Sequence, residues 1–242
     1  MSKMRHFGMT DFAQYRAKPF LDFLTSEQIA TLRTIGHVRH YSNGRFIQSR
    51  GDADSGLSIV QSGAAQAGIY SSDGGFILTS FLGPGQTFGE FTVFTDLPRT
   101  HDLAAIGSTQ LLHIPAKRFL SLCDEDPSYL LAITRATLLR SFIALEMLHA
   151  LRILPLLPRV AKYLLILSPD PPAEPELRFR QSDLAATLGV SRASMNRALS
   201  DLEDLGLISR GYATIRIICM TRLSDWLEAR TGDGKQINFA PE

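Results

Sequence analysis

Two short motifs in the first half of the chain carry residue types that bind a phosphate group. They are Phe88-Gly89-Glu90-Phe91 and Pro98-Arg99-Thr100. A phosphate is held by exposed backbone amides at a helix N-terminus together with a planar cation. The first motif could supply the amides and Arg99 the cation, while Glu90 could accept a hydrogen bond from a ribose hydroxyl. Taken singly, a glycine more often marks a turn and an arginine more often lies in solvent, so the prediction depends on the combination.

A second set of residues, between Gln181 and Leu199, has the pattern of two short helices joined by a tight turn. Gly189 suits the left-handed conformation that such a turn requires after the first helix. Ser191 is placed to cap the second helix, and Ala185 is small enough to let the helices cross closely. This pattern is typical of a helix-turn-helix, whose second helix reads the major groove of DNA.

Polar side chains near the start of that second helix could contact base edges or phosphates, and an arginine bidentate on guanine contributes roughly 1–3 kcal/mol of base discrimination. A solvated helical hairpin is the alternative. The residues that follow favour DNA binding, because Arg210-Gly211-Tyr212-Ala213-Thr214 lies between two strand-like segments, as the wing of a winged helix would. We expect contacts to DNA from Arg180, Gln181, Ser191, Arg192, Ser194, Asn196, Arg197 and Arg210.

The composition excludes some classes of protein. A net charge of +1 gives no general affinity for nucleic acid, so DNA binding must depend on local charge. The apolar runs fall short of the roughly 20 residues that span a bilayer, and the N-terminus lacks a signal sequence, so we expect a cytoplasmic protein without membrane contact. Cys123 and Cys219 are expected to be reduced core thiols, and two cysteines cannot hold an iron-sulfur cluster.

The elements that position these motifs differ between the two halves of the chain. Ten glycines between Gly44 and Gly89 separate strand-like runs such as 57–60 and 76–81, and a further run follows at 111–114. Short strands with regular turns predict an antiparallel roll or barrel. Ahead of them, Thr25-Ser26-Glu27-Gln28 has the pattern of a helix start with capping residues.

A stretch without glycine or proline, from Ser128 to Leu154, predicts one long helix. Its apolar residues form two stripes, which suggests that one side is covered by its own domain and the other by a partner helix. Burial within a single subunit is the alternative. Pro155 and Pro158 then interrupt the helical pattern. We therefore expect a hinge there, followed by an amphipathic helix from Arg159 to Leu167.

The roll, the two phosphate motifs, the long helix and the winged helix-turn-helix together resemble the cyclic-AMP receptor protein and fumarate/nitrate reductase regulator family of bacterial transcription factors. The resemblance covers residues 20–222. It implies an α+β fold in three parts. These are a cyclic-nucleotide-binding-like β-roll domain over 1–126, a dimerisation helix and hinge over 127–157, and a winged helix-turn-helix DNA-binding domain with a C-terminal tail over 158–242.

The resemblance also implies a phosphate-binding cassette in which Arg99 neutralises a cyclic phosphate and Glu90 holds the ribose. The effector is then a cyclic nucleotide, cAMP or cGMP. Thr100, directly after the arginine, resembles cGMP-binding domains in which that hydroxyl meets the guanine. The expected ligand contacts are Gly89, Glu90, Phe91, Arg99, Thr100, His101, Ala144, Leu145 and Leu148.

The partners implied are a second copy of the chain, double-stranded DNA with a palindromic operator, and RNA polymerase. Some positions depart from the family pattern. His101 and Asp102 stand where nucleotide-binding members carry small or apolar residues, although on a strand they should face opposite sides. Ala144 and Leu145 replace the Thr-Ser pair that contacts adenine, and Ala193 replaces a glutamate of the reading helix, so base recognition and the preferred operator must differ.

Three alternatives stay open at this stage. A metal-dependent enzyme on a β-roll needs clustered histidines with a carboxylate. His37 and His40, three residues apart in a strand-like stretch, should instead face opposite sides at the surface, so we expect neither a metal nor catalysis. A haem-based gas sensor could use His101, His113 or His149 as an iron ligand. An effector-independent regulator would keep the fold and the DNA contacts without a ligand.

Overall fold

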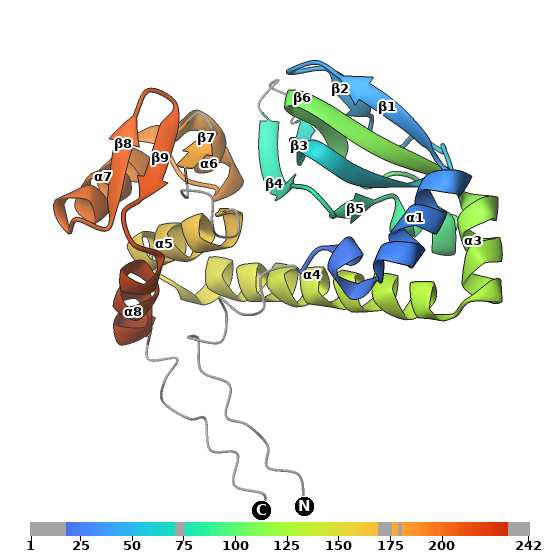
Figure 1. The fold of residues 1–242 in the computed structure, drawn as a ribbon. Helices are drawn as coiled ribbons and strands as arrows, with labels where there is room; N and C mark the ends of the chain where they lie inside the picture. The colour runs from blue at the N-terminus through green and yellow to red at the C-terminus, as the bar shows by residue number, and fades with distance from the viewer. Residues whose placement is uncertain (1–17, 71–75, 169–175, 179–180, 232–242) are drawn as a thin grey trace, which may run out of the picture. The chain divides into compact units, whose positions relative to one another are not determined.

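A computed structural model describes residues 18–70, 76–168, 176–178 and 181–231 of the chain. These residues divide into two compact units, 18–141 and 142–231. Figure 1 shows the order of the elements within each unit. The predicted α+β fold is confirmed, with strands dominating the first unit and helices the second.

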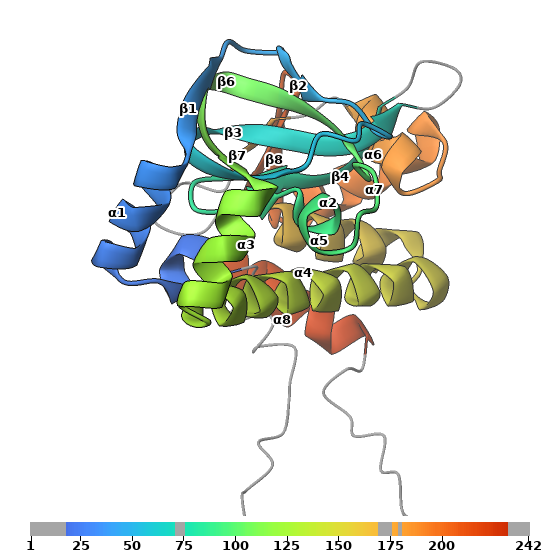
Figure 2. The ribbon, with the colours of Figure 1, turned by 90° about the vertical axis from the view of Figure 1, so that its right-hand side faces the viewer.

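The first unit is built on a six-stranded antiparallel sheet. Its strands follow the order β1-β6-β3-β4, with β2 paired to β6 and β5 paired to β3. The two long strands, β3 and β6, lie side by side (Figure 2) and hold the others in register. The strands are β1 (His37–Tyr41), β2 (Phe46–Gln48), β3 (Gly56–Tyr70), β4 (Phe76–Leu82), β5 (Thr87–Phe88) and β6 (Asp102–Pro115).

Alternation along these strands creates two cores. Successive strand residues point to opposite faces, so Leu112 of β6 faces the helices whereas Leu111 faces the interior of the roll. The helical side is filled by Phe20, Leu32 and Phe119, all with at most 1% of their surface exposed. The helices of this unit are the 3-10 helix η2 (Phe20–Phe23), α1 (Ser26–Ile35), α2 (Glu90–Phe94) and α3 (Ala116–Glu125).

The predicted helix start near residue 25 is confirmed. Thr25 caps α1 by accepting a hydrogen bond from the amide of Gln28 at 3.3 Å, and the Gln28 side chain accepts one from the amide of Thr25 at 2.9 Å. This reciprocal capping box satisfies two amides that the helix itself leaves unpaired.

The long helix is also confirmed, as α4 (Ser128–Ile153). It runs from the first unit into the second, because the boundary between the units falls after Ser141. It leaves a series of large apolar side chains exposed. They are Leu130, Leu131, Leu138, Phe142, Leu145, Leu148, Leu151 and Ile153.

The predicted start of the next helix is wrong. α5 spans Leu156–Leu167, so the helix begins three residues before the expected Arg159 and includes Pro158. Pro155 is the residue before the helix, and Pro158 lies in its first turn. Proline is tolerated there because amides in a first turn have no partner within the helix. The interruption between α4 and α5 is therefore only Leu154 and Pro155.

The second unit continues with a helix-turn-helix and a three-stranded sheet of order β7-β9-β8. α5 packs against α7 and α8, and α6 packs against α7. The β8–β9 hairpin confirms the predicted wing. The elements are β7 (Glu176–Arg178), α6 (Gln181–Thr187), α7 (Arg192–Asp204), β8 (Ile208–Gly211), β9 (Thr214–Ile217) and α8 (Met220–Thr231).

Two further expectations concern the cysteines and the membrane. Cys123 is buried as predicted, but Cys219 is exposed, so the prediction of a core thiol is wrong there. Its position in the connection between β9 and α8 explains the difference, because connections run over the surface. Among the described helices, none combines the length and the apolar character that crossing a bilayer requires.

Candidate functional site

Arg99 lies inside the first unit with only 4% of its surface exposed. Its Nη2 donates to the carbonyl of Gly56 at 2.9 Å, and its backbone amide donates to the carbonyl of Asp52 at 2.9 Å. The Nε and Nη1 atoms are buried and have no hydrogen-bond partner among the described residues. Because buried polar groups are nearly always paired, these two donors fit the oxygen atoms of an anion.

Gly89 is the residue that lets the guanidinium lie where it does. A Cβ atom built at this position would lie 2.0 Å from Nη1 of Arg99 and 2.3 Å from the carbonyl oxygen of Gly56. The backbone of Gly89 also has a φ of 102°, a conformation that side-chain-bearing residues rarely adopt. Glycine is thus required here both for the close approach of Arg99 and for the turn that starts α2.

Three carboxylates surround the arginine. Burial lowers the pKa of Arg99, and Asp54, Glu90 and Asp52, in that order of influence, act against this shift. An arginine stays protonated at neutral pH even when its pKa is depressed, because its ordinary pKa lies far above neutral pH. The site therefore presents a fixed positive charge with two free donors.

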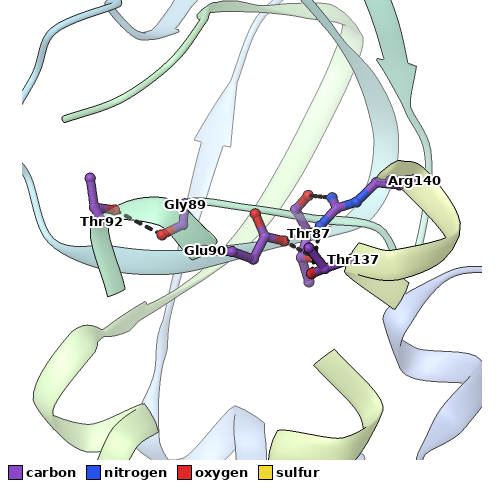
Figure 3. A network of polar contacts seen from close by, with 6 residues as sticks. All are labelled: Thr87, Gly89, Glu90, Thr92, Thr137 and Arg140. Carbon is purple, nitrogen blue, oxygen red and sulfur yellow. Dashed lines mark hydrogen bonds and ion pairs between the residues drawn. The ribbon is translucent and has the colours of Figure 1, made fainter. Parts of the chain in front are cut away.

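Glu90 is connected to the long helix (Figure 3). Its Oε1 forms an ion pair with Nη2 of Arg140 on α4 at 2.5 Å and accepts a hydrogen bond from the hydroxyl of Thr87. Arg140 also donates to the carbonyl of Thr87, and its Nη2 lies 3.5 Å from the hydroxyl of Thr137. Thus a residue of the phosphate motif and a residue of α4 belong to one network.

Arg140 and Thr87 are not among the site residues predicted from the sequence. Arg140 lies four residues before Ala144, which the resemblance had assigned to the ligand site, and residues four apart share a helix face. That spacing could have pointed to Arg140. No pattern in the sequence marks Thr87, whose role depends on the pairing of β5 with β3.

The two residues after Thr100 make different hydrogen bonds. The hydroxyl of exposed Thr100 lies 2.8 Å from Nδ1 of His101, and burial together with Arg50 holds the pKa of His101 below its ordinary value. The carboxylate of Asp102 accepts hydrogen bonds from the backbone amides of Arg50 at 2.9 Å and Tyr70 at 3.2 Å. The carboxylate of Asp102 is therefore occupied by two backbone amides of the roll.

A small polar cavity of about 50 Å³ adjoins Arg99 inside the roll. His113, which is 5% exposed, lines it and pairs through Nδ1 with the hydroxyl of Ser58 at 3.0 Å. Burial is the main reason that the pKa of His113 falls to about 4, so the ring is neutral at physiological pH. The other lining residues are Arg39, Tyr41, Ile47, Gln48, Asp52, Asp54, Phe88 and Leu111.

The remaining expected ligand contacts are exposed. Phe91 follows Glu90 on α2 with 49% of its surface exposed, while Ala144, Leu145 and Leu148 are exposed positions on the part of α4 that belongs to the second unit. Their contact with a ligand stays a prediction.

The helix-turn-helix has the local structure that the sequence predicts. Gly189 adopts a φ of 64° at the turn, and the hydroxyl of Ser191 caps α7 by accepting from the amide of Ser194 at 3.1 Å. Met195 and Leu199, on the inner face of α7, are fully buried. The side chains on the opposite face are exposed: Ser191, Arg192, Ala193, Ser194, Asn196 and Arg197.

Arg210 has a partner within the protein. Its Nε donates to Oε2 of Glu203 at 2.7 Å, and its amide donates to Oε1 of the same residue at 2.8 Å. These bonds tie the wing to the last turn of α7 and lower the pKa of Glu203. Arg180 lies outside the described residues and Gln181 begins α6; DNA contact by these three residues stays a prediction.

The alternatives based on a metal gain no support from the described residues. Within them, no group of three or more His, Cys, Asp or Glu side chains converges as a metal site would require. His37 and His40 are both exposed, as expected, although the ring of His37 also packs against that of His113 with 5.0 Å between centroids. Ligation of a haem iron by His101, His113 or His149 stays a hypothesis.

Comparison with known proteins finds two domain families in the chain. Residues 38–126 match the family described as Cyclic nucleotide-binding domain, and residues 158–226 match the Crp-like helix-turn-helix domain. Over 204 residues the chain is 28% identical to the Cyclic AMP receptor protein of Thermus thermophilus, covering 84% of this chain and 93% of that protein.

A second curated protein and a solved structure are also similar to the chain. The cAMP-activated global transcriptional regulator CRP of Salmonella typhimurium is 24% identical over 185 residues, which cover 74% of this chain and 88% of that protein. Among solved structures, the c-di-GMP responsive global regulator CLP of Xanthomonas campestris has a TM-score of 0.64 at 23% identity, covering 80% of this chain and 99% of that chain. At that identity, the structural likeness shows the fold alone.

Replacing Gly89 with alanine should destabilise the protein and displace Arg99. A residue with a side chain at a positive φ of this kind carries a strain of about 1–3 kcal/mol, and the added Cβ would overlap Nη1 of Arg99. Urea unfolding of Gly89→Ala should show the loss in the free energy of unfolding. The matched control is Gly83→Ala, because Gly83 has open space around its Cβ position. Equal stability of the two variants would contradict this account of Gly89.

His113 should make the protein less stable in mild acid. Its pKa is about 4 in the folded state against an ordinary 6.5, so between these values the unfolded chain binds more protons. The free energy of unfolding should therefore decrease as the pH falls from 6.5 towards 4. In urea titrations at pH 7.5 and 5, His113→Gln should show a smaller pH-dependent loss than the wild type. His40→Gln, at an exposed position, should behave like the wild type.

Proposed function

Because the chain belongs to the cyclic-AMP receptor protein and fumarate/nitrate reductase regulator family of transcription regulators, we propose that it is a homodimer whose DNA affinity is controlled by a cyclic nucleotide, cAMP or cGMP, bound in the β-roll. The buried guanidinium of Arg99 carries this proposal, since its Nε and Nη1 have no partner among the described residues. Arg99 would hold the cyclic phosphate through these donors. The phosphate oxygens would accept the hydrogen bonds of the two donors that the protein leaves unbonded.

Glu90 would hold the ribose. Both of its hydrogen bonds within the protein end on Oε1, so Oε2 faces no protein donor among the described residues and can accept a bond from a sugar hydroxyl. Arg140 keeps the carboxylate oriented. The same ion pair connects the ligand site to α4, so ribose binding at Glu90 would act on Arg140 as well.

The purine is not defined by the described contacts. Thr100 offers an exposed hydroxyl beside His101, which suits the edge of a guanine. Ala144, Leu145 and Leu148 would add apolar contacts and no hydrogen-bonding groups. This combination favours cGMP at least as much as cAMP, and the binding experiment below includes both.

Dimerisation would use the apolar stripe on α4. Leu138, Leu145 and Leu148 are 63%, 64% and 49% exposed in a single chain, and a large exposed apolar patch is typical of an interaction surface. A parallel partner helix would cover them. A two-fold dimer then presents its two reading helices to successive major grooves of a palindromic operator, about 34 Å apart.

The exposed face of α7 would read the operator. Arg192 and Arg197 lie there without a protein partner among the described residues, which leaves both guanidinium groups for bases or phosphates. The nucleotide must bind one arrangement of the two DNA-binding units better than another, because equal affinity would shift nothing. RNA polymerase is the further partner that we propose for the DNA-bound dimer.

Removing the guanidinium should abolish nucleotide binding. We expect calorimetry with cAMP and with cGMP to show binding of at least one by the wild type and by Arg45→Ala, since Arg45 is an exposed arginine of the same roll. Arg99→Ala and Arg99→Gln should bind neither, with folded-state circular dichroism unchanged. Absence of heat with both nucleotides in the wild type would leave an effector-independent regulator. Normal binding by the Arg99 variants would show that the assigned pocket is wrong.

Removing either arginine of the reading helix should weaken DNA binding and leave nucleotide binding unchanged. With an operator selected from random palindromic DNA, loss of a bidentate contact to guanine in Arg192→Ala or Arg197→Ala should cost roughly 1–3 kcal/mol and relax specificity at one position. Loss of a phosphate contact should instead reduce the slope of log affinity against log salt concentration by about one. Arg135→Ala, at an exposed position of α4, is the control of equal charge.

A further inference from the structure

The junction between α4 and α5 is unusually short. Only Leu154 and Pro155 separate the two helices, and Pro155 has no amide hydrogen with which to continue α4. The amide of Leu154 still bonds to the carbonyl of Ala150 at 3.0 Å, and the carbonyl of Pro155 already accepts from Arg159 at 3.1 Å. The direction of α5 therefore depends on the backbone torsion angles of Leu154 and Pro155, and the proline ring already fixes φ of Pro155.

Arg159 restrains the junction from the α5 side. Its Nε and Nη2 both donate to the carbonyl of Leu154, at 3.2 Å and 2.7 Å. This carbonyl is one of those at a helix end that lack an intrahelical partner. A planar guanidinium bonded twice to one oxygen fixes the orientation of that peptide relative to the first turn of α5.

Lys162 restrains α5 at a second point, one turn further along. Its Nζ forms an ion pair with Oε2 of Glu146 on α4 at 2.8 Å. The lysine side chain is 4% exposed and that of Glu146 27% exposed. Because the pair is partly shielded from water, it is screened less than an ion pair between two exposed side chains. The pair therefore restrains the spacing between α4 and α5 at this point.

These two restraints act on the helix that anchors the DNA-binding unit. Val160, Ala161 and Leu164 on α5 are fully buried, and the helix packs against α7, which carries the reading face, and against α8. A change in the direction of α5 therefore moves α7 as well. The ion pair of Glu146 with Lys162 thus joins α4 to the helix that packs against the reading helix α7.

We propose that Glu146 and Lys162 are positioning residues that make the junction of α4 and α5 rigid, so that a change at α4 is transmitted to the reading helix. This rests on the proposed function for the signal at α4, but the rigidity of the junction does not depend on a ligand. Breaking the pair loosens the junction and uncouples DNA affinity from nucleotide binding, while the nucleotide site in the roll is unchanged.

The first measurement is hydrogen–deuterium exchange of the full-length protein without ligand. In Glu146→Gln and in Lys162→Met, the amides of residues 154–162 should exchange at least tenfold faster than in the wild type. Lys162→Arg, which retains a cation, and Arg152→Gln, at an exposed position in the last turn of α4, should exchange at the wild-type rate. Unchanged exchange in both broken-pair variants would overturn the proposal. Where a single variant fails to fold, the exchanged pair Glu146→Lys with Lys162→Glu takes its place and should restore wild-type protection.

The second measurement is the ratio of the dissociation constants for operator DNA without and with the cyclic nucleotide. This ratio should fall at least tenfold in Glu146→Gln and Lys162→Met and stay unchanged in the two controls, with the nucleotide dissociation constant within twofold of the wild type throughout. Faster exchange with an unchanged ratio would overturn the transmission role. If the wild type shows no nucleotide effect at all, the proposed effector is wrong, and the exchange rates alone decide whether the pair makes the junction rigid.

Discussion

The first unit depends on a charged group being kept inside a β-roll. Arg99 is almost completely buried, and its position is fixed by the carbonyl of Gly56, by the loop that contains Asp52, and by the absence of a side chain at Gly89. A buried charge is costly unless it is paired. Much of the roll therefore serves to hold this one group: β3 provides Gly56, and the turn before α2 provides Gly89. The pairing of β3 with β5 brings these elements together.

Local patterns in the sequence predicted the elements well. The capping box at Thr25, the turn at Gly189, the cap at Ser191 and the long helix all follow from interactions between residues a few positions apart, and the structure confirms each of them. Pro158 was the exception. Its effect on a helix depends on the turn in which it lies, and a proline in the first turn has no hydrogen bond to break.

Contacts between distant residues could not be predicted in the same way. Glu90 and Arg140 are 50 positions apart, and nothing local shows that they pair. Arg210 was expected to contact DNA because it lies in the predicted wing, yet its guanidinium is bonded to Glu203 at the end of α7. Such partners are set by how the helices and sheets pack, and in this chain the residues involved carry long charged side chains that reach across two elements.

Because the exposed leucines of α4 are the proposed dimer surface, the concentration of the protein in the cell becomes a regulatory variable. A chain that has not found a partner leaves Leu138 and Leu145 in water, and covering apolar surface is the main driving force of association. If these side chains form the dimer, the fraction of paired chains follows the law of mass action. At low copy number the pool would be mostly unpaired and unable to span a two-part operator. Synthesis and turnover of the chain would then act as an input to gene control alongside the small-molecule signal, with a response to dosage that is steeper than linear.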